Sequence, residues 1–399
     1  MGKKKLDHLK TNTVNKNVSL ALNWLTKSGI QNRNKGKSVE FGAFNAWYDC
    51  NNKKYSYMYS EITGYLITSM VFHYKITKNL FYLTCAKNAA DWLIKNAQDN
   101  NGGFKCLFLI NKKLNYEKKN NYIYSFDNGV IINGLVNLYN ETKIKKYLKA
   151  AEKSANFLSL NFIKKNNEIS PVYDIKEKKF INNLKEWSLV PGSYHTKIAM
   201  GYLNLYKTTK KKYYLASGKK ILKVYLKKQK KSGEFMSTKH NTNLHPHCYS
   251  LEGYWACGEF LKNKKFNSVA LKGTKWVLKN INLDGFPPRL KFKNKFNFSE
   301  RIDILSQTLR LIILHKKKLK LNKVDKNKIK KLIKNIINNQ KLNSKNIKVK
   351  GGFIWGKKSN GEKTNDVNSW VTAFAAQGLS ILEDNRSNKI LKSNPFYLV

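Results

Sequence analysis

Hydrophobic positions recur along the chain in a helical pattern that is repeated at intervals of about 50 to 70 residues. Each unit begins with a helix that is apolar nearly all round, continues with an amphipathic helix rich in lysine, and closes on a turn with glycine and an aromatic residue. The apolar helices are predicted at residues 60–77, 125–142, 193–208, 246–261, 299–315 and 368–383. The amphipathic partners of the first five are predicted at residues 82–97, 146–162, 213–229, 266–280 and 326–340.

The sixth apolar helix has no amphipathic partner after it, but the start of the chain offers one. Val18, Ala21, Leu22 and Leu25 follow the i, i+3, i+4, i+7 spacing of a helix predicted at residues 18–28. Helices that are apolar all round are buried on two sides, so they form an inner layer covered by the amphipathic helices. Six hairpins closed into a ring predict an all-α fold, an (α/α)6 barrel or toroid of six inner and six outer helices.

The repeat runs through nearly the whole chain, which predicts one domain. We expect a basic N-terminal extension over residues 1–17, a single toroid over residues 18–384, and a C-terminal tail over residues 385–399. Alternating apolar residues predict short β-hairpins over one end of the barrel, in the links 105–124, 166–187 and 291–298.

The charge of the chain is strongly basic, with 76 Lys and Arg against 25 Asp and Glu, a net charge of +51. Of the basic residues 71 are lysines and only 5 are arginines, and they are spread along the whole chain. Base and phosphate readers favour arginine, because its planar group forms paired hydrogen bonds. We therefore expect weak, salt-sensitive adsorption to polyanions and no specific nucleic-acid partner.

Targeting signals and cysteine usage indicate a cytoplasmic protein. No apolar run approaches the roughly 18 residues of a membrane span, and no apolar core of a signal peptide follows the lysine-rich start. The 5 cysteines are scattered and odd in number, so we expect reduced thiols. The sequence leaves the oligomeric state open.

The beginnings of the six inner helices are the candidate site. In a closed barrel all inner helices run in the same direction, so their N-termini meet at one mouth. The predicted N-caps are Ser60, Ser125, Ser193, His245, Ser299 and Asn368. The side chains just inside these caps are Glu61, Asp127, His195, His247, Arg301 and Trp370, and two acids, Asp303 and Glu252, lie deeper.

The two histidines at this mouth suggest proton-transfer chemistry. His195 and His247 open successive inner helices, where the helix dipole favours a neutral imidazole. A neutral histidine can accept or donate a proton at neutral pH. The competing interpretation is a hydrogen-bonded core histidine, and Glu61 and Asp127 likewise complement the helix dipole without any function.

A metal site is the alternative interpretation of the sequence His245-Pro246-His247-Cys248. Zinc requires three or four ligands in a tetrahedral array. Pro246 turns His247 into a helix, and no second pair of ligands at metal spacing follows. We predict no metal and no cofactor.

Aromatic residues gather at the same end and suit a carbohydrate ligand, because aromatic rings stack on the apolar faces of sugars. The competing interpretation is that they fill a large helical core. The candidates for substrate binding are Trp47, Tyr194, Tyr249 and Trp370.

Three segments resemble the six-hairpin glycosidase-like superfamily, and among its members the VpsJ-like polysaccharide biosynthesis proteins most. They are residues 193–206 (SYHTKIAMGYLNLY), 245–253 (HPHCYSLEG) and 368–377 (NSWVTAFAAQ). The resemblance implies a carbohydrate-active protein of polysaccharide biosynthesis or metabolism that acts on a sugar or oligosaccharide, with a uronate favoured by the basic charge.

The resemblance implies two sets of roles. In an epimerase-like enzyme, which we favour from the sequence, His195 and His247 move protons, Asp127 assists them, and Arg301 holds a carboxylate or hydroxyl of the substrate. In a glycoside or unsaturated-uronide hydrolase, Asp127 acts with Glu61 or Asp303 as a pair of carboxylates.

Two further functions stay open at this point. One is a glycan-binding toroid without catalysis. The other is a terpenoid-cyclase-like toroid, which the turns QDNNGGF, QKKSGEF and KGGFIW resemble, although the aspartate-rich acid motif of such cyclases is absent.

Overall fold

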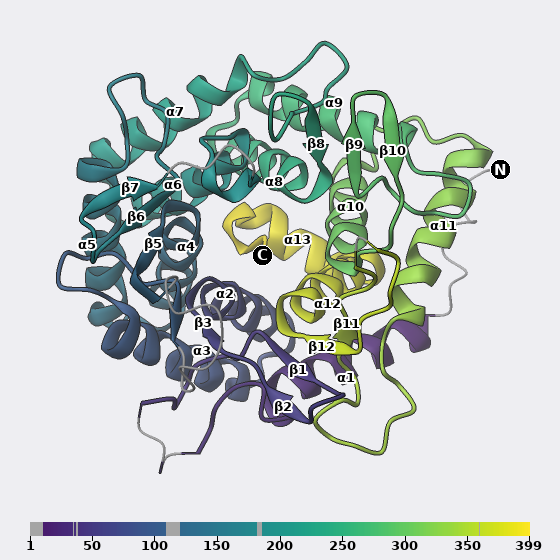
Figure 1. Ribbon diagram of the computed structural model, residues 1–399, viewed down its shortest axis with the longest axis horizontal. Coiled ribbons are helices and arrows are strands. Elements are labelled where there is room, and N and C mark those ends of the chain that lie inside the picture. Colours follow the sequence, from purple (N-terminus) through teal and green to yellow (C-terminus); the bar gives the residue numbers. More distant parts are fainter. Residues whose placement is uncertain (1–10, 35, 37–38, 109–119, 182–185, 359) are drawn as a thin grey trace.

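Twelve helices form two concentric rings in the computed structural model, which describes residues 11–34, 36, 39–108, 120–181, 186–358 and 360–399 (Figure 1). The inner ring consists of α2 (Ser60–Thr77), α4 (Ser125–Thr142), α6 (Ile198–Thr209), α8 (Leu244–Leu261), α10 (Ile302–His315) and α12 (Ser369–Glu383). The outer ring consists of α1 (Thr11–Lys27), α3 (Leu80–Trp92), α5 (Lys145–Asn161), α7 (Lys212–Leu226), α9 (Lys264–Lys279) and α11 (Lys323–Asn338).

The inner ring is closed. Each inner helix contacts the next one along the chain, and α12 contacts α2. Each outer helix packs on the inner helix of its hairpin, and α1 packs on α12, as the unpaired sixth helix predicted. The (α/α)6 barrel is therefore confirmed. Among the described residues we find no helix long and apolar enough to cross a membrane.

The helix starts differ from the predicted caps. Asn368 is confirmed as an N-cap, and its side chain accepts a hydrogen bond from the backbone N–H of Val371 at 3.2 Å. At the other five helices the predicted cap was wrong by one or two residues, because tyrosine, glycine, asparagine or arginine precedes the first turn there. The observed caps are Tyr59, Tyr124, Gly192, Asn243 and Arg301.

Two helices differ most from the prediction at their start. The N-terminal helix begins at Thr11 and so includes part of the predicted extension, of which residues 1–10 lie outside the described residues. The third inner helix begins as a 3₁₀ segment, η4 (Ser193–Lys197), before α6 continues it.

In the turns that follow the outer helices, a glutamine side chain forms hydrogen bonds both within the turn and to the next outer helix, and a glycine allows the turn to close. Gln98 bridges to Phe104, and its amide donates to the backbone of Gly102 and of Ala150 on α5, each at 3.0 Å. Gly102 has a φ of +106°, a conformation that favours glycine. The same arrangement recurs at three other turns, which start at Gln31, Gln229 and Gln340.

Small residues let the inner helices approach closely. A Cβ atom on Gly134 would lie 2.7 Å from the carbonyl oxygen of Gly64 on the neighbouring helix. A Cβ atom on Gly201 would likewise lie 2.8 Å from the oxygen of Gly129. The spacing of the inner ring, and so the width of the barrel, depends on these glycines.

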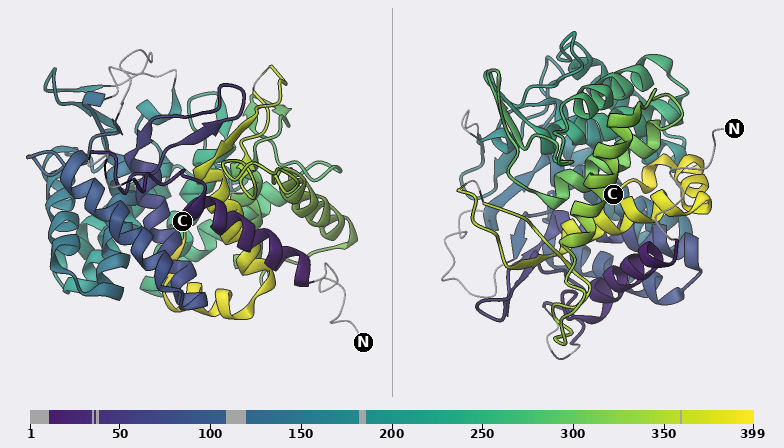
Figure 2. Two further views of the ribbon diagram at one scale, coloured as in Figure 1. Left: turned by 90° about the horizontal axis from the view of Figure 1, so that it is seen from below. Right: turned by 90° about the vertical axis from the view of Figure 1, so that its right-hand side faces the viewer.

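Short antiparallel strands cover the end of the barrel where the inner helices begin (Figure 2). The predicted hairpins in the second and third links are present as β6 (Val172–Asp174) with β7 (Lys179–Ile181) and β9 (Leu290–Phe292) with β10 (Lys295–Asn297). In the first link, β4 (Leu107–Phe108) and β5 (Tyr122–Tyr124) pair with β3 (Met58–Tyr59) and β6 instead of each other. Residues 109–119 of that link lie outside the described residues.

The predicted tail is folded into the barrel. Helix α13 (Asn385–Ser393) contacts α12 and α2 at the end opposite the strands, and η5 (Pro395–Tyr397) follows it (Figure 2). Residues 395–399 then lie buried near the axis of the ring (Figure 1).

Candidate functional site

A cavity of about 230 Å³ opens among the N-termini of the inner helices. The second residue of each inner helix, counted from its observed cap, faces this cavity or a residue of its wall: Glu61, Phe126, Tyr194, His245, Asp303 and Trp370. The remaining wall is formed by residues nearby in the same helices or in the covering loops, namely Tyr59, Ile62, Tyr65, Tyr124, Asp127, Trp187, Ser188, Tyr249 and Arg301.

Glu61 is a carboxyl group that holds a proton near neutral pH. Burial raises its pKa to about 7, although hydrogen bonds from Tyr59 and Tyr65 and the charge of Lys197 act in the other direction. A carboxyl with such a pKa is populated in both the acid and the base form at pH 7, which suits proton transfer.

Asp127, on the neighbouring helix α4, is the second carboxyl of the wall and is 3% exposed. Tyr124 and Tyr194 lie around it. Burial, with the charge of Asp127 as a further cause, raises the pKa of both phenols above the usual value. Both phenols therefore stay protonated, and the hydroxyl of Tyr194 donates to the backbone oxygens of Ser188 at 3.2 Å and Val190 at 3.1 Å.

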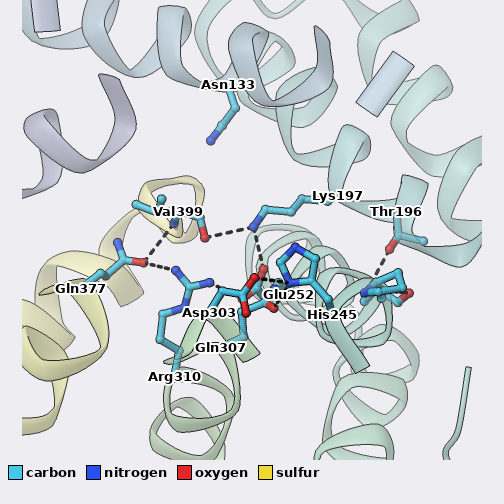
Figure 3. A network of polar contacts seen from close by, with 12 residues as sticks. Asn133, Thr196, Lys197, His245, Glu252, Asp303, Gln307, Arg310, Gln377 and Val399 are labelled. Atoms are coloured by element: carbon cyan, nitrogen blue, oxygen red, sulfur yellow. Dashed lines mark hydrogen bonds and ion pairs between the residues drawn. The ribbon is translucent and has the colours of Figure 1, made fainter. Parts of the chain in front are cut away.

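His245 is the histidine that faces the cavity. Its Nδ1 lies 2.7 Å from the side-chain oxygen of Gln307 and 3.8 Å from Oδ2 of Asp303 (Figure 3). Burial lowers the pKa of His245 to about 4, so the ring is neutral at pH 7. Because Nδ1 donates to Gln307, Nε2 is the acceptor nitrogen of the ring.

Asp303 lies behind the wall and holds two residues that line it. It accepts a hydrogen bond from Arg301 Nε at 3.1 Å and pairs with the same guanidinium through a second nitrogen. It also accepts from the indole N–H of Trp370 at 3.4 Å. Burial raises the pKa of Asp303, but the charges and hydrogen bonds of its neighbours, those of Arg301 first among them, together more than offset it, so the pKa lies below the usual value.

Aromatic side chains form one side of the cavity. The ring of Trp187 meets that of Tyr194 edge-on at 5.2 Å and that of His245 at 6.1 Å. Phe126 packs against both Tyr194 and Tyr249, at 5.5 and 4.7 Å. Tyr194, Tyr249 and Trp370 thus lie where the sequence predicted a substrate-binding surface.

His195 and His247 do not line this cavity. His195 accepts from the backbone N–H of Gly192 at 3.3 Å and lies 3.4 Å from the hydroxyl of Tyr225 on the outer helix α7. His247 accepts from the backbone N–H of Phe235 at 3.1 Å, and its ring contacts Trp276 of α9 at 5.1 Å. The sequence predicted that these two histidines would share one cavity with Asp127 and Arg301. The structure does not bring them together.

Trp47 is likewise outside the cavity wall. It begins β1 (Trp47–Asp49), and its ring meets that of Tyr57 at 5.1 Å. Of the predicted side chains, Glu61, Asp127, Tyr194, Tyr249, Arg301 and Trp370 line the cavity.

His245 and Gln307 are two residues that sequence reasoning did not assign to the site, and Phe126 and Tyr65 of the wall are two more. A signal for His245 was present, because Asn243 two residues earlier is a good N-cap and places His245 at the same helical position as Glu61. Among the described residues, no three His, Cys, Asp or Glu side chains are grouped as metal ligands. The absence of a metal stays a prediction.

Comparison with known proteins supports the fold and adds one functional indication. Residues 46–187 match the model of glycosyl hydrolase family 76. No curated protein matches the sequence.

Solved structures resemble the chain over nearly its whole length at low identity. A cellobiose 2-epimerase from Bacillus thermoamylovorans is 12% identical, with a TM-score of 0.74 over 93% of this chain and 98% of that one. A D-mannose isomerase is 11% identical, with a TM-score of 0.74 over 96% and 99%. An unsaturated glucuronyl hydrolase from Bacillus sp. GL1 is 12% identical, with a TM-score of 0.65 over 94% and 98%. The chain therefore has the same toroid fold as these three enzymes.

Proposed function

We propose that the protein is a carbohydrate-active enzyme that hydrolyses a glycosidic bond in this cavity. The observation that carries the proposal is the pair of carboxyl groups in one enclosed wall, Glu61 on α2 and Asp127 on α4. Both lie within residues 46–187, which match the family 76 glycosyl hydrolase model. A buried cluster of ionisable groups also favours an enzyme over a glycan-binding toroid without catalysis.

The two carboxyl groups suit the two roles that hydrolysis requires. Glu61, with a pKa of about 7, protonates the leaving oxygen. Asp127 either attacks the sugar carbon or activates a water molecule. His245, Tyr194 and the indole of Trp187 then bind hydroxyl groups and the apolar face of the sugar ring.

A neutral sugar fits the wall better than the uronate expected from the basic composition. Arg301 is the one lysine or arginine among the described residues of the wall, and its guanidinium is already paired with Asp303. A substrate carboxylate would lie beside Glu61 and Asp127, and like charges at short distance repel. A role in polysaccharide biosynthesis, kinship with VpsJ-like proteins and a cytoplasmic location belong to the proposal and rest on the sequence alone.

Epimerisation is the second candidate, and His245 favours it. A neutral imidazole whose Nδ1 is fixed on Gln307 presents Nε2 as a base, which suits proton removal from a sugar carbon. Of the solved structures described above, one is named a cellobiose 2-epimerase and one a D-mannose isomerase.

One experiment tests the proposal against this second candidate. Neutral oligosaccharides and unsaturated uronides are incubated with the protein in D₂O, and the products are followed by NMR. Hydrolysis creates new reducing ends, whereas epimerisation incorporates deuterium at a ring carbon without cleavage. Glu61→Gln and Asp127→Asn should each reduce cleavage by about 10²–10⁴-fold. Glu362→Gln, at a surface carboxylate paired with Lys358, is the matched control and should retain full activity.

A further inference from the structure

A cluster of buried charges lies directly beneath the cavity and is not part of its wall. Glu252 of α8 accepts from Lys197 Nζ at 2.6 Å and from a guanidinium nitrogen of Arg310 at 2.5 Å. The three side chains are 4% exposed or less, although charged groups are rarely buried so fully. Such a cluster is costly to desolvate, which suggests a function beyond stability.

Lys197 connects this cluster to the cavity. Its Nζ lies 4.7 Å from the ring centre of Tyr249 and 5.2 Å from that of Tyr65, and both tyrosines line the cavity. The positive charge of Lys197 is also one of the causes that lower the pKa of Glu61. Burial lowers the pKa of Lys197 itself to about 8, so the amine is still charged at pH 7.

The buried segment of residues 394–399 holds Lys197 from the other side (Figure 3). Lys197 Nζ donates to the main-chain oxygen of Val399 at 3.0 Å. Gln377 of α12 accepts from the backbone N–H of Val399 at 3.0 Å and donates to the oxygen of Tyr397 at 2.8 Å. Leu398, 1% exposed, packs below the cavity beside Tyr65 and Lys197.

The same segment is fixed by amides of the inner ring. Asn133 and Asn137 of α4 both donate to the main-chain oxygen of Phe396 at 2.8 Å. Gln377 further accepts from Arg310 at 3.2 Å, so the segment and the charge cluster share one hydrogen-bond network. Movement of the segment would therefore change the surroundings of Lys197 and of Arg310 together.

We propose that Lys197 is a positioning residue of the site, held beneath the rings of Tyr65 and Tyr249 by residues 394–399 so that its positive charge acts on the carboxyl group of Glu61. The inference rests on the proposed function in one respect, the assignment of Glu61 as the general acid. The other charged groups around Lys197 are Glu252, Arg310 and Glu61 itself. Glu252 is paired with both Lys197 and Arg310, so the two cations and one anion leave one net positive charge, and this charge acts on Glu61.

The test measures the protonation of Glu61 directly and requires no substrate. The carboxyl ¹³C shift of Glu61, assigned by its absence in Glu61→Gln, is followed against pH in the full chain. The midpoint should lie near 7 in the wild type and should rise by about one pH unit or more in Lys197→Met, because an opposite charge is lost. Lys197→Gln, which retains hydrogen-bonding groups without the charge, should show the same rise.

Lys207→Met is the matched control. Lys207 is also partly buried and also contacts the segment, since its Nζ donates to the side chain of Asn394 at 3.0 Å. Lys207 lies in the last turn of α6, about 15 Å further along the helix from the cavity than Lys197, so its loss should leave the Glu61 midpoint unchanged. An unchanged midpoint in both Lys197 variants, or an equal rise in Lys207→Met, would overturn the proposal.

The role of residues 394–399 is tested by removing residues 396–399 from the wild type and from the Lys197→Gln variant. If the segment acts through Lys197, its removal should move the midpoint towards the Lys197→Gln value and have no effect in that variant. Equal effects in both backgrounds would overturn this part. Gln377→Leu in the full chain loosens the same segment and replaces the deletion if the shortened chain does not fold.

Failure of the proposed function gives a different result. If the midpoint rises as expected but no glycoside is cleaved at any pH, the coupling of Lys197 to Glu61 stands and the hydrolase assignment falls. If cleavage occurs, its decline with rising pH should shift upward in Lys197→Gln together with the midpoint.

Discussion

His245 and His247 lie two residues apart on α8, yet they face opposite sides of the inner ring. His245 lines the cavity, whereas His247 faces the outer helix α9 and accepts a backbone hydrogen bond. Two residues turn a helix by about 200°, which accounts for the opposite directions. Both rings are buried and both have a pKa lowered to about 4. A shifted pKa alone therefore does not mark a functional histidine here; the side of the helix does.

The same contrast separates two regions of the molecule. The cavity wall carries Glu61, Asp127 and His245, side chains with chemistry to offer a ligand. The layer between the rings carries His195 and His247, which satisfy backbone groups of turns and cap segments. We expect substitutions in the wall to affect activity and substitutions in the layer to affect stability.

The largest effect is expected at Glu61 and sharpens this contrast. Glu61→Gln should reduce turnover by about 10²–10⁴-fold. It should also make the protein more stable above pH 7. The pKa of Glu61 is raised from 4.5 to about 7 in the folded state, so wild-type stability decreases as pH rises through that window, and glutamine removes the loss. Turnover and urea unfolding at pH 5 and pH 8 check both parts.

The dependence of stability on acid is the next largest effect. Burial lowers the pKa of His73, His195, His245 and His247 from 6.5 to about 3 or 4. Below pH 6.5 each of these histidines takes up a proton in the unfolded state but not in the folded state. The stability that is fully present above pH 6.5 is therefore lost as pH falls towards the folded-state pKa. Unfolding free energy should therefore decline by several kcal/mol between pH 6.5 and 4. The decline should be smaller in His247→Ala, and an identical decline there would contradict the burial of that ring.

Separate alanine substitutions of the two α8 histidines test the comparison directly. His247→Ala should cost about 1–3 kcal/mol of stability, since the N–H of Phe235 loses its buried partner, and should leave activity at 25 °C unchanged. His245→Ala should reduce kcat/KM about tenfold or more, the equivalent of one lost hydrogen bond to substrate. If turnover were lost in His247→Ala and retained in His245→Ala, His247 would be the catalytic histidine.

The smallest expected effect is a difference in KM between substitutions of two tryptophans, Trp187 in the wall and Trp47 outside it. Trp187→Ala should raise KM by about 2- to 10-fold, because a stacking face of about 0.5–1.5 kcal/mol is lost from the wall. Trp47→Ala, outside the wall, should leave KM within error of the wild type. Steady-state kinetics on one neutral glycoside compare the two, and equal effects would show that the ligand extends to β1.

The fold was largely predictable, because inner helices that are buried all round give a pattern that surface helices do not. Residues 60–77 and 125–142 were predicted with their observed bounds. The path of residues 394–399 into the barrel was not predictable. It depends on amides of distant helices, such as Asn133 and Gln377, and six residues carry no periodicity.

The site was predictable in place but not in detail. The mouth of the inner helices is where the cavity lies, and Glu61 and Asp127 line it. The assignment of His247 followed from taking His245 as the N-cap, whereas Asn243 is the cap. An error of two residues at a helix start rotates the side chain away from the mouth, so the sequence pattern placed the correct helix but the wrong face.

The most direct test of the central claim is a crystal structure of Glu61→Gln with a neutral oligosaccharide. This variant should bind substrate and fail to cleave it. We predict one sugar ring inside the cavity, against Trp187 and Tyr194, with a ring or linking oxygen within hydrogen-bond distance of residue 61 and a carbon or water facing Asp127. A sugar bound only on the outer helices, or beside His195 and His247 between the rings, would contradict the account.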